Sequence, residues 1–233
     1  MRALLSLVIF ALSTSLAVAE VPHRIEASYD LQVKSVTLAR VREVFVREGD
    51  QYHIESITKP VGLLALFKPE TIIATSEGYI GEHGLLPLKY THRRAKDIQK
   101  NSAAEFDWTH HELIHRDNGG IRQLNLAEGT QDRLSMMYQF VVEPPRGRLE
   151  IKLDMTNGSM IEKMHYQVKP EQTVTTSFGT MRSYNLTSLP LNVPKKSNVW
   201  LAVDHSFVPC KVVFTEDGSN TLSQVLTALK IVP

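Results

Sequence analysis

Residues 111–115 read His-Glu-Leu-Ile-His, a pattern whose residue types and spacing suit zinc chemistry. On a helix, His111 and His115 would lie on one face and share a zinc ion, while Glu112 would polarise a zinc-bound water. Zinc needs a third protein ligand, and no motif selects one. The segment also alternates as a strand that runs into a turn at residues 117–120, and on a strand Glu112 points away from the histidines. We therefore expect a strand without a metal, and we keep a zinc-dependent hydrolase as the alternative.

Asp204, His205 and Ser206 form a second group of catalytic residue types, contiguous in the sequence. Neighbours in sequence rarely aim their side chains at one another, and a catalytic triad is defined by its geometry in space. The G-x-S-x-G pattern that exposes a nucleophilic serine is missing. We expect no catalytic residue and no cofactor, and hence a protein that is not an enzyme.

Cys210 is the only cysteine of the chain. It lies in the apolar run FVPCKVVF, and an unpaired cysteine in such surroundings usually behaves as a small buried hydrophobic residue. We expect a buried thiol rather than a reactive one, in a fold stabilised by packing without disulfides.

The N-terminus has the pattern of a secretory signal peptide. Arg2 supplies a positive charge, residues 3–11 are apolar, and Ala17 and Ala19 are the small residues that a signal peptidase reads. The apolar stretch is shorter than the about 20 residues that span a bilayer, so we disfavour a retained membrane anchor. We expect cleavage after Ala19, a location in the periplasm and a mature single domain over residues 20–233.

The charges of the chain nearly balance, with 26 basic and 25 acidic residues. Without a strong overall field, the protein is not expected to bind nucleic acid. Residues 89–100 are locally basic, and we interpret them as a solvated strand face. Contact with lipid head groups or another anionic envelope surface is the alternative for this run.

Alternation of apolar and polar residues dominates the sequence and is typical of half-buried strands. It is clearest in residues 24–33, 149–155 and 160–168. The last two runs flank Asn157-Gly158, a pair that favours a tight hairpin turn. Further turn signals recur along the chain. The sequence therefore predicts a mainly β protein with a large curved antiparallel sheet, an open barrel or a β-roll.

Two segments break the alternation. Residues 61–67 are apolar between two prolines and predict a short helix or tight loop. Near residues 130–142, apolar side chains recur at helical spacing from Leu134, which predicts one amphipathic helix packed on the sheet. We expect Asp132 to complement the dipole of this helix and Arg133 to tie the helix to a strand.

Several short stretches resemble the exported bacterial family called domain of unknown function 3108. The stretches are YDL at 29–31, GLLALFKP at 62–69, SEG at 76–78, GLLPL at 84–88, FDW at 106–108, QDRLSMMYQ at 131–139 and WLAVD at 200–204 with Pro209. In that family the segment after Phe-Asp-Trp is a variable hairpin, where no zinc motif is expected. The resemblance brings no catalytic or cofactor residues with it.

The Trp-x-x-x-Asp pattern at residues 200–204 also resembles, more loosely, the closing hairpin of periplasmic lipoprotein-carrier proteins. That likeness implies an open, curved sheet over helices with an apolar cavity, although fold alone does not imply function. The residues that we expect to line such a cavity are Trp108, Met136, Met137, Tyr138 and Trp200. The alternative is that these side chains simply fill the core.

We interpret the chain as a periplasmic cell-envelope protein of unknown role, and binding of an apolar or lipid-like ligand in the concave sheet is the most specific hypothesis. The first alternative is the zinc-dependent hydrolase built on residues 111–115. The second is a scaffold that binds another envelope protein through an open sheet edge.

Overall fold

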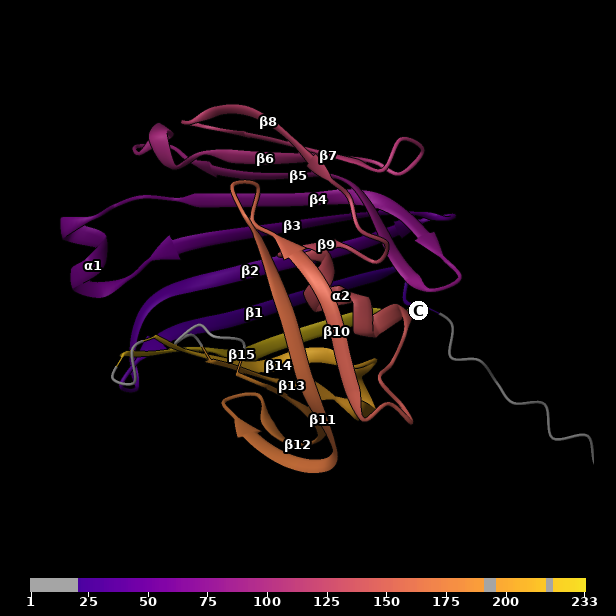
Figure 1. Cartoon of the computed structure of the whole chain (residues 1–233). Coiled ribbons are helices and arrows are strands. Elements are labelled where there is room, and N and C mark those ends of the chain that lie inside the picture. The colour runs from indigo at the N-terminus through magenta and orange to yellow at the C-terminus, as the bar shows by residue number, and fades with distance from the viewer. Residues whose placement is uncertain (1–20, 191–195, 217–219) are drawn as a thin grey trace, which may run out of the picture.

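The computed structural model describes residues 21–190, 196–216 and 220–233. The predicted signal peptide therefore lies outside the described residues. Fifteen strands of the described chain form one sheet, which curves round on itself without closing (Figure 1). Its neighbouring strands are antiparallel except for one short parallel pair, so the predicted fold class is confirmed. No helix in these ranges is long and apolar enough to cross a membrane.

The sheet consists of two consecutive meanders. The first contains β1 (Arg24–Val33), β2 (Val36–Glu48), β3 (Gln51–Pro60), β4 (Ile72–Gly81), β5 (Gly84–Arg94), β6 (Ser102–Asp107), β7 (Glu112–Asp117) and β8 (Gly120–Asn125). The second contains β9 (Gln131–Asp132), β10 (Glu150–Thr156), β11 (Ile161–Thr176), β12 (Gly179–Ser188), β13 (Lys196–Ala202), β14 (Val208–Glu216) and β15 (Asn220–Val232). The first and last strands, β1 and β15, pair with each other and join the two meanders in mid-sheet.

The strands form where the sequence alternates, because one face of the curved sheet is buried and the other meets solvent. In β1 the side chains of Ile25, Ala27 and Tyr29 are buried, and the residues between them are partly exposed. Tyr29 pairs with Val41 on β2 and with Leu226 on β15, and both partners are also buried. The inner face therefore holds the core.

The predicted turn at Asn157 and Gly158 joins β10 to β11. Gly158 has a φ of +86°. The side-chain oxygen of Asn157 accepts hydrogen bonds from the backbone amides of Ser159 and Met160, at 2.9 and 3.0 Å. The β10–β11 hairpin crosses in front of the first meander (Figure 1). At its tip, Thr156 lies 2.7 Å from the Nε2 atom of His115, and the Ser102 hydroxyl donates to the Asn157 carbonyl at 2.8 Å. The hairpin is thus fastened to β6 and β7.

Within the described ranges, four short helical segments interrupt the strands: α1 (Gly62–Phe67), α2 (Ser135–Val142) and the 3-10 turns η1 (Ile98–Lys100) and η2 (Val203–His205). The helix predicted near 130–142 is α2, but it begins only at Ser135. Gln131 and Asp132 are extended instead, because they pair with β10 as β9. The Asp132 carboxylate then accepts the amides of Leu134 and Ser135, at 2.8 and 2.9 Å, which satisfies donors of the first helical turn.

The buried side chains of the described residues form three clusters. α2 contributes Tyr138 to the first and Phe140 to the second, so the helix packs between the inner faces of the two meanders. Cys210 belongs to the third cluster and is fully buried, with its Sγ atom 3.2 Å from the Trp200 carbonyl oxygen. Burial raises the pKa of the thiol to about 12. The prediction of a buried, unreactive cysteine is confirmed as far as its burial is concerned.

Candidate functional site

The His-Glu-x-x-His segment lies on a turn and a strand, as the alternation predicted, and not on a helix. His111 is exposed in the turn with a φ of +54°, Glu112 begins β7, and His115 is buried on that strand. Burial, followed by the charge of Arg122, lowers the pKa of His115. Across the ranges that the structure describes, no three metal-ligating side chains gather. The helical geometry that the zinc motif requires is therefore not formed.

Asp204 and His205 lie in η2, and their side chains turn to different neighbours. The Asp204 carboxylate accepts two hydrogen bonds from the Arg182 guanidinium, at 2.5 and 3.1 Å. The imidazole of His205 packs against the ring of Phe178. This segment connects β13 to β14, and its side chains do not form a catalytic triad.

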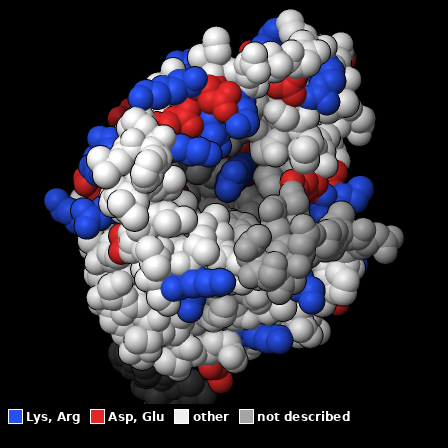
Figure 2. All heavy atoms as spheres, turned by 90° about the vertical axis from the view of Figure 1, so that its left-hand side faces the viewer, with Lys and Arg blue, Asp and Glu red and all other residues white. Residues whose placement is uncertain are grey.

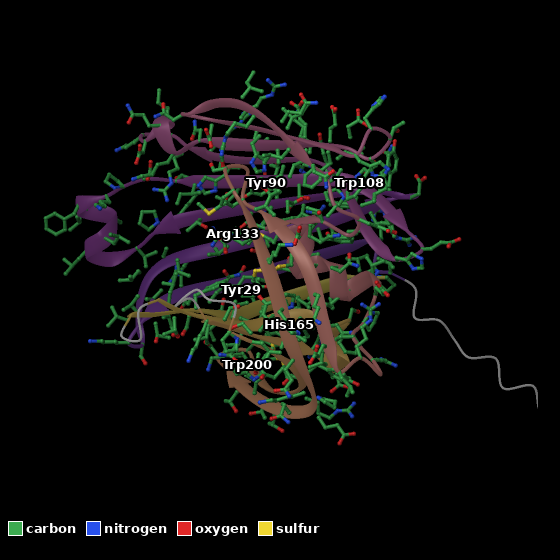
Figure 3. All side chains as sticks on the ribbon, viewed as in Figure 1. Tyr29, Tyr90, Trp108, Arg133, His165 and Trp200 are labelled. Atoms are coloured by element: carbon green, nitrogen blue, oxygen red, sulfur yellow. The ribbon has the colours of Figure 1, made fainter. Side chains whose placement is uncertain are left out.

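The five residues predicted to line a cavity do not share one surface. Trp108 donates its indole N–H to the Pro87 carbonyl at 2.7 Å and, with Met137, packs on the first cluster, to which Tyr138 belongs. Met136 is buried on α2. Trp200 packs on the third cluster, and Figure 3 shows it at the opposite end of the molecule from Trp108. A role for these residues in ligand binding stays a prediction.

A buried carboxyl group joins α2 to the sheet. Glu43 on β2 is 7% exposed and accepts hydrogen bonds from the hydroxyls of Tyr138 and Ser56, both at 3.2 Å. Burial raises the pKa of Glu43, although the hydrogen bonds and the charge of Arg133 act against the rise. Burial and the facing Glu43 also raise the pKa of Tyr29 on β1. The interior therefore favours the neutral acid at this position.

A second buried carboxyl group, that of Asp132, holds the start of α2. It accepts a hydrogen bond from Ser76 on β4 at 2.5 Å in addition to the two amides of the helix. Burial raises its pKa to about 6, against the effect of these hydrogen bonds. Next to it, the Gln131 side chain donates to the Leu85 carbonyl on β5 at 2.9 Å. The edge strand β9 is thereby tucked against the inner face of the sheet.

Arg133 differs from both of its neighbours in the chain. Asp132 and Leu134 are buried, but Arg133 is exposed. Its guanidinium forms no hydrogen bond or ion pair with any residue that the structure describes, so the expected tie to a strand is not formed. In Figure 3 it lies between Tyr90 on β5 and Tyr29 on β1. Arg133 is thus a cation within the curved sheet that forms no ion pair with a described carboxylate, although its charge acts on the buried Glu43.

Two groups that lie near Arg133, His92 and Tyr90, favour their uncharged forms. Burial, then the charges of Arg133 and Arg94, lower the pKa of His92 on β5, which favours its uncharged form. Arg94 is itself paired with Glu70 at 3.3 Å. Burial raises the pKa of Tyr90, and its hydroxyl forms no hydrogen bond to another described residue. Arg133 is therefore the cation of this region, with the buried Asp132 carboxyl as its neighbour in the chain, and the Tyr90 hydroxyl is a free donor.

The end of the molecule at which α1 lies is open. Figure 2 looks onto this end and shows it hollowed at its centre, with a basic side chain inside the hollow. We call this opening the hollow end. Leu31, Ala39 and Ile72 stand at this end of β1, β2 and β4, on the same face as the buried residues of these strands. The hollow end thus combines apolar walls with a cation.

Another concavity, of about 490 Å³, lies on the outer face over β2 to β5. Its polar rim includes Glu48 and the facing pair His53 and Glu77, whose side chains are 3.8 Å apart. It is open to solvent and adjoins the bulge between Glu77 and Gly78. None of its lining residues has a buried side-chain atom without a hydrogen-bond partner in the part of the chain that the structure describes, so we regard the hollow end as the better candidate site.

Comparisons with known proteins find a solved structure of similar fold and a family that this chain matches. The chain is similar to a beta-barrel-like protein of domain of unknown function DUF1849 from Brucella abortus, with a TM-score of 0.56 over 89% of this chain and 97% of that chain. The two sequences are 12% identical, so this likeness shows the fold alone. A search of curated proteins finds no match. Residues 28–225 match the family described as protein of unknown function (DUF3108), and the chain belongs to that family.

Sequence reasoning did not select Arg133, Tyr90 or Glu43 as site residues. Glu43 carried a usable signal, because it is an acid at an alternating position whose neighbours on the same face, Val41 and Phe45, are apolar. Arg133 carried none, because an arginine near a helix start is usually solvated or paired. Arg133 becomes a candidate binding residue only in the folded protein, where it lies within the curved sheet without an ion-pair partner among the described residues.

Proposed function

We propose that the protein is an exported component of the bacterial cell envelope that binds an anionic amphiphile in its hollow end. The ligand class is a lipid-like molecule with an apolar chain and a carboxylate or phosphate head group. The observation that carries the proposal is Arg133, an unpaired cation inside the curved sheet. The signal-peptide pattern at residues 1–19 supports export, and it stays a prediction from the sequence.

The hollow end offers contacts for both the head group and the acyl chain of this ligand. The planar guanidinium of Arg133 can donate two parallel hydrogen bonds to a carboxylate or phosphate, and Tyr90 can donate a third. Such charge-assisted hydrogen bonds are stronger where water is partly excluded. The partly exposed apolar side chains of Leu31 and Ile72 offer a path for an acyl chain from Arg133 toward α1.

Native mass spectrometry of the protein, purified from a bacterial periplasm without detergent, tests the proposal. We expect a stoichiometric adduct of lipid mass. Titration with oleate and with lysophosphatidylglycerol then measures affinity for a carboxylate and for a phosphate probe. Arg133→Gln should weaken binding of either probe by about tenfold or more, since hydrogen bonds to charged groups contribute roughly 1.5–3 kcal/mol.

Arg40→Gln is the matched control. Arg40 is on β2, its side chain is 78% exposed, and its nearest acidic partner, Asp30, is 3.8 Å away. This variant should bind both probes like the unmodified protein. A bare polypeptide mass together with no binding of either probe contradicts the proposal, and equal affinities for Arg133→Gln and Arg40→Gln remove Arg133 from it.

The open edge of the sheet supports a second candidate function, the binding of a partner protein by strand addition. Among the described strands, β8 pairs only with β7, and its outer side is free. Ile121 on this strand is 67% exposed, and unpaired strand edges invite a further strand. Replacing Gln123 with proline should abolish a partner captured through this edge while leaving lipid binding unchanged.

A further inference from the structure

α1 is an apolar helix that buries none of its side chains. Leu63, Leu66 and Phe67 are 74%, 75% and 80% exposed. A helix of six residues is too short to be stable alone, so it must be held from both sides. Val61 donates its amide to the Leu38 carbonyl at 2.9 Å. The apolar side chains are therefore presented by a fixed element.

The position of α1 puts these side chains at the outermost point of the hollow end. α1 connects β3 to β4 and projects from the left-hand end of the sheet in Figure 1. Glu70, in the segment that follows α1, pairs with Arg94 at the end of β5. This contact brings η1 to the same end of the sheet, where Ile98 is 72% exposed. The apolar side chains of α1 and η1 thus belong to one end of the molecule.

Basic residues dominate the two segments that carry these apolar side chains. Residues 59–70 and 93–100 contain six basic and two acidic residues, a formal excess of four, in a chain whose net charge is +1. Lys59, Lys68 and Lys96 are exposed, and Lys100 pairs with Asp97. In sequence, basic residues therefore outnumber acidic ones around the apolar tip, and Figure 2 shows basic and acidic side chains intermixed on this end of the molecule.

We propose that this end of the molecule docks on the surface of a lipid bilayer that contains anionic phospholipids. Leu63, Leu66 and Phe67 enter the boundary between head groups and acyl chains, and the surrounding lysines meet the phosphates. Charge complementarity favours this occupant, because the lysines beside the exposed apolar side chains match anionic head groups and a bilayer needs no preformed groove to receive them. α1 inserts without crossing the bilayer, since its length is far below the span of about 20 residues.

Vesicle sedimentation tests this surface. The full processed protein should sediment with vesicles of equal parts phosphatidylglycerol and phosphatidylcholine, and far less with pure phosphatidylcholine or at high salt. Leu66→Asp combined with Phe67→Asp should weaken partitioning by about tenfold or more, because two apolar side chains no longer enter the interface. Lys68→Glu should weaken binding only to the anionic vesicles.

Two controls isolate the contribution of the tip. Leu149→Asp replaces an apolar side chain that is also 80% exposed but lies next to β10, and it should sediment like the unmodified protein. Arg133→Gln should do the same, so that loss of ligand binding and loss of membrane binding stay distinguishable. Thermal unfolding of each variant should be unchanged, because the replaced side chains are exposed.

Three results would overturn the membrane proposal. One is the absence of sedimentation with either vesicle type, and another is an equal loss in the Leu149→Asp variant. The third is a dimer, seen by light scattering, that Leu66→Asp dissociates in the absence of vesicles. That last result would assign the tip to a second copy of the chain.

Discussion

The Tyr138 hydroxyl on α2 donates a hydrogen bond to the buried carboxyl of Glu43 on β2, at 3.2 Å, across 95 positions of sequence. The ring of Tyr138 also stacks on Phe45, which lies on the same strand and face as Glu43, with ring centroids 5.5 Å apart. One side chain of α2 thus makes a polar and an apolar contact with the same strand. These contacts set how the helix, and Arg133 just before it, sit within the sheet.

We predict that Tyr138→Phe lowers the free energy of unfolding by about 1–3 kcal/mol, because Glu43 stays buried and loses a donor. Urea unfolding measures the loss. In the double variant Tyr138→Phe/Glu43→Leu the two losses should not add, since each replacement removes one partner of the same hydrogen bond. Tyr79→Phe is the control, because Tyr79 is 39% exposed. Additive losses would show that the two groups act independently.

Asp132 makes stability depend on pH. Burial raises its pKa from 3.8 to about 6 in the folded protein. Between these values the folded state binds more protons than the unfolded state, so stability falls as pH rises through this window. The full difference corresponds to at most roughly 3 kcal/mol. The contribution of Asp132 should therefore lower the urea midpoint as the pH rises from 4 toward neutral. His92 and His115, whose pKa values are lowered, act in the opposite direction.

Asp132→Asn is the control for this pH dependence. The amide oxygen can still accept the backbone amides at the start of α2, but it does not titrate. The variant should lose much of the decline between pH 4 and pH 7 that the unmodified protein shows. The residual slope in the same direction is expected from Glu43, whose pKa burial also raises. An unchanged slope would mean that Asp132 titrates at its ordinary value.

Gly158 is predicted to be irreplaceable at the tip of the β10–β11 hairpin. A Cβ atom there would stand 2.8 Å from the Ser102 hydroxyl and 3.0 Å from the Ala103 amide nitrogen. Gly158→Ala should therefore destabilise the protein by about 1–3 kcal/mol and speed hydrogen exchange in β10. Gly120→Ala is matched, because Gly120 also has a positive φ but has no atom within 4 Å of its Cβ position. It should lose less stability.

Cys210 is predicted to react with a thiol reagent only after unfolding. The side chain is fully buried, and the pKa of about 12 leaves almost no thiolate at neutral pH. Labelling with a chromogenic disulfide should follow the urea transition. Fast labelling in native buffer would contradict both the burial and the raised pKa.

The local parts of the fold could be predicted from the sequence, because they depend on short patterns. The alternation in residues 24–33, the Asn157-Gly158 turn and the apolar spacing from Leu134 each predicted the element that forms. The strand order could not be predicted this way. Pairing of β1 with β15 depends on packing between residues about 200 positions apart, which no local pattern encodes.

The candidate site was harder to predict than the fold. Trp108 and Trp200 were selected because large aromatic residues line many ligand cavities, but the same residue type also fills cores. Arg133 was expected to tie the helix to a strand, but its guanidinium forms no hydrogen bond or ion pair with a described residue. A residue whose importance comes from an absent partner leaves no positive signal in a single sequence.

The central pairing of β1 with β15 makes the two ends of the chain next neighbours in the finished sheet. A chain that emerges from a ribosome or a pore N-terminus first can form its first meander early, but β1 must wait with one side unpaired until the last strand arrives. Contacts of this sequence separation slow folding. Completion of the sheet therefore requires β15, and a truncation before residue 220 would divide the sheet at its middle rather than remove an edge strand.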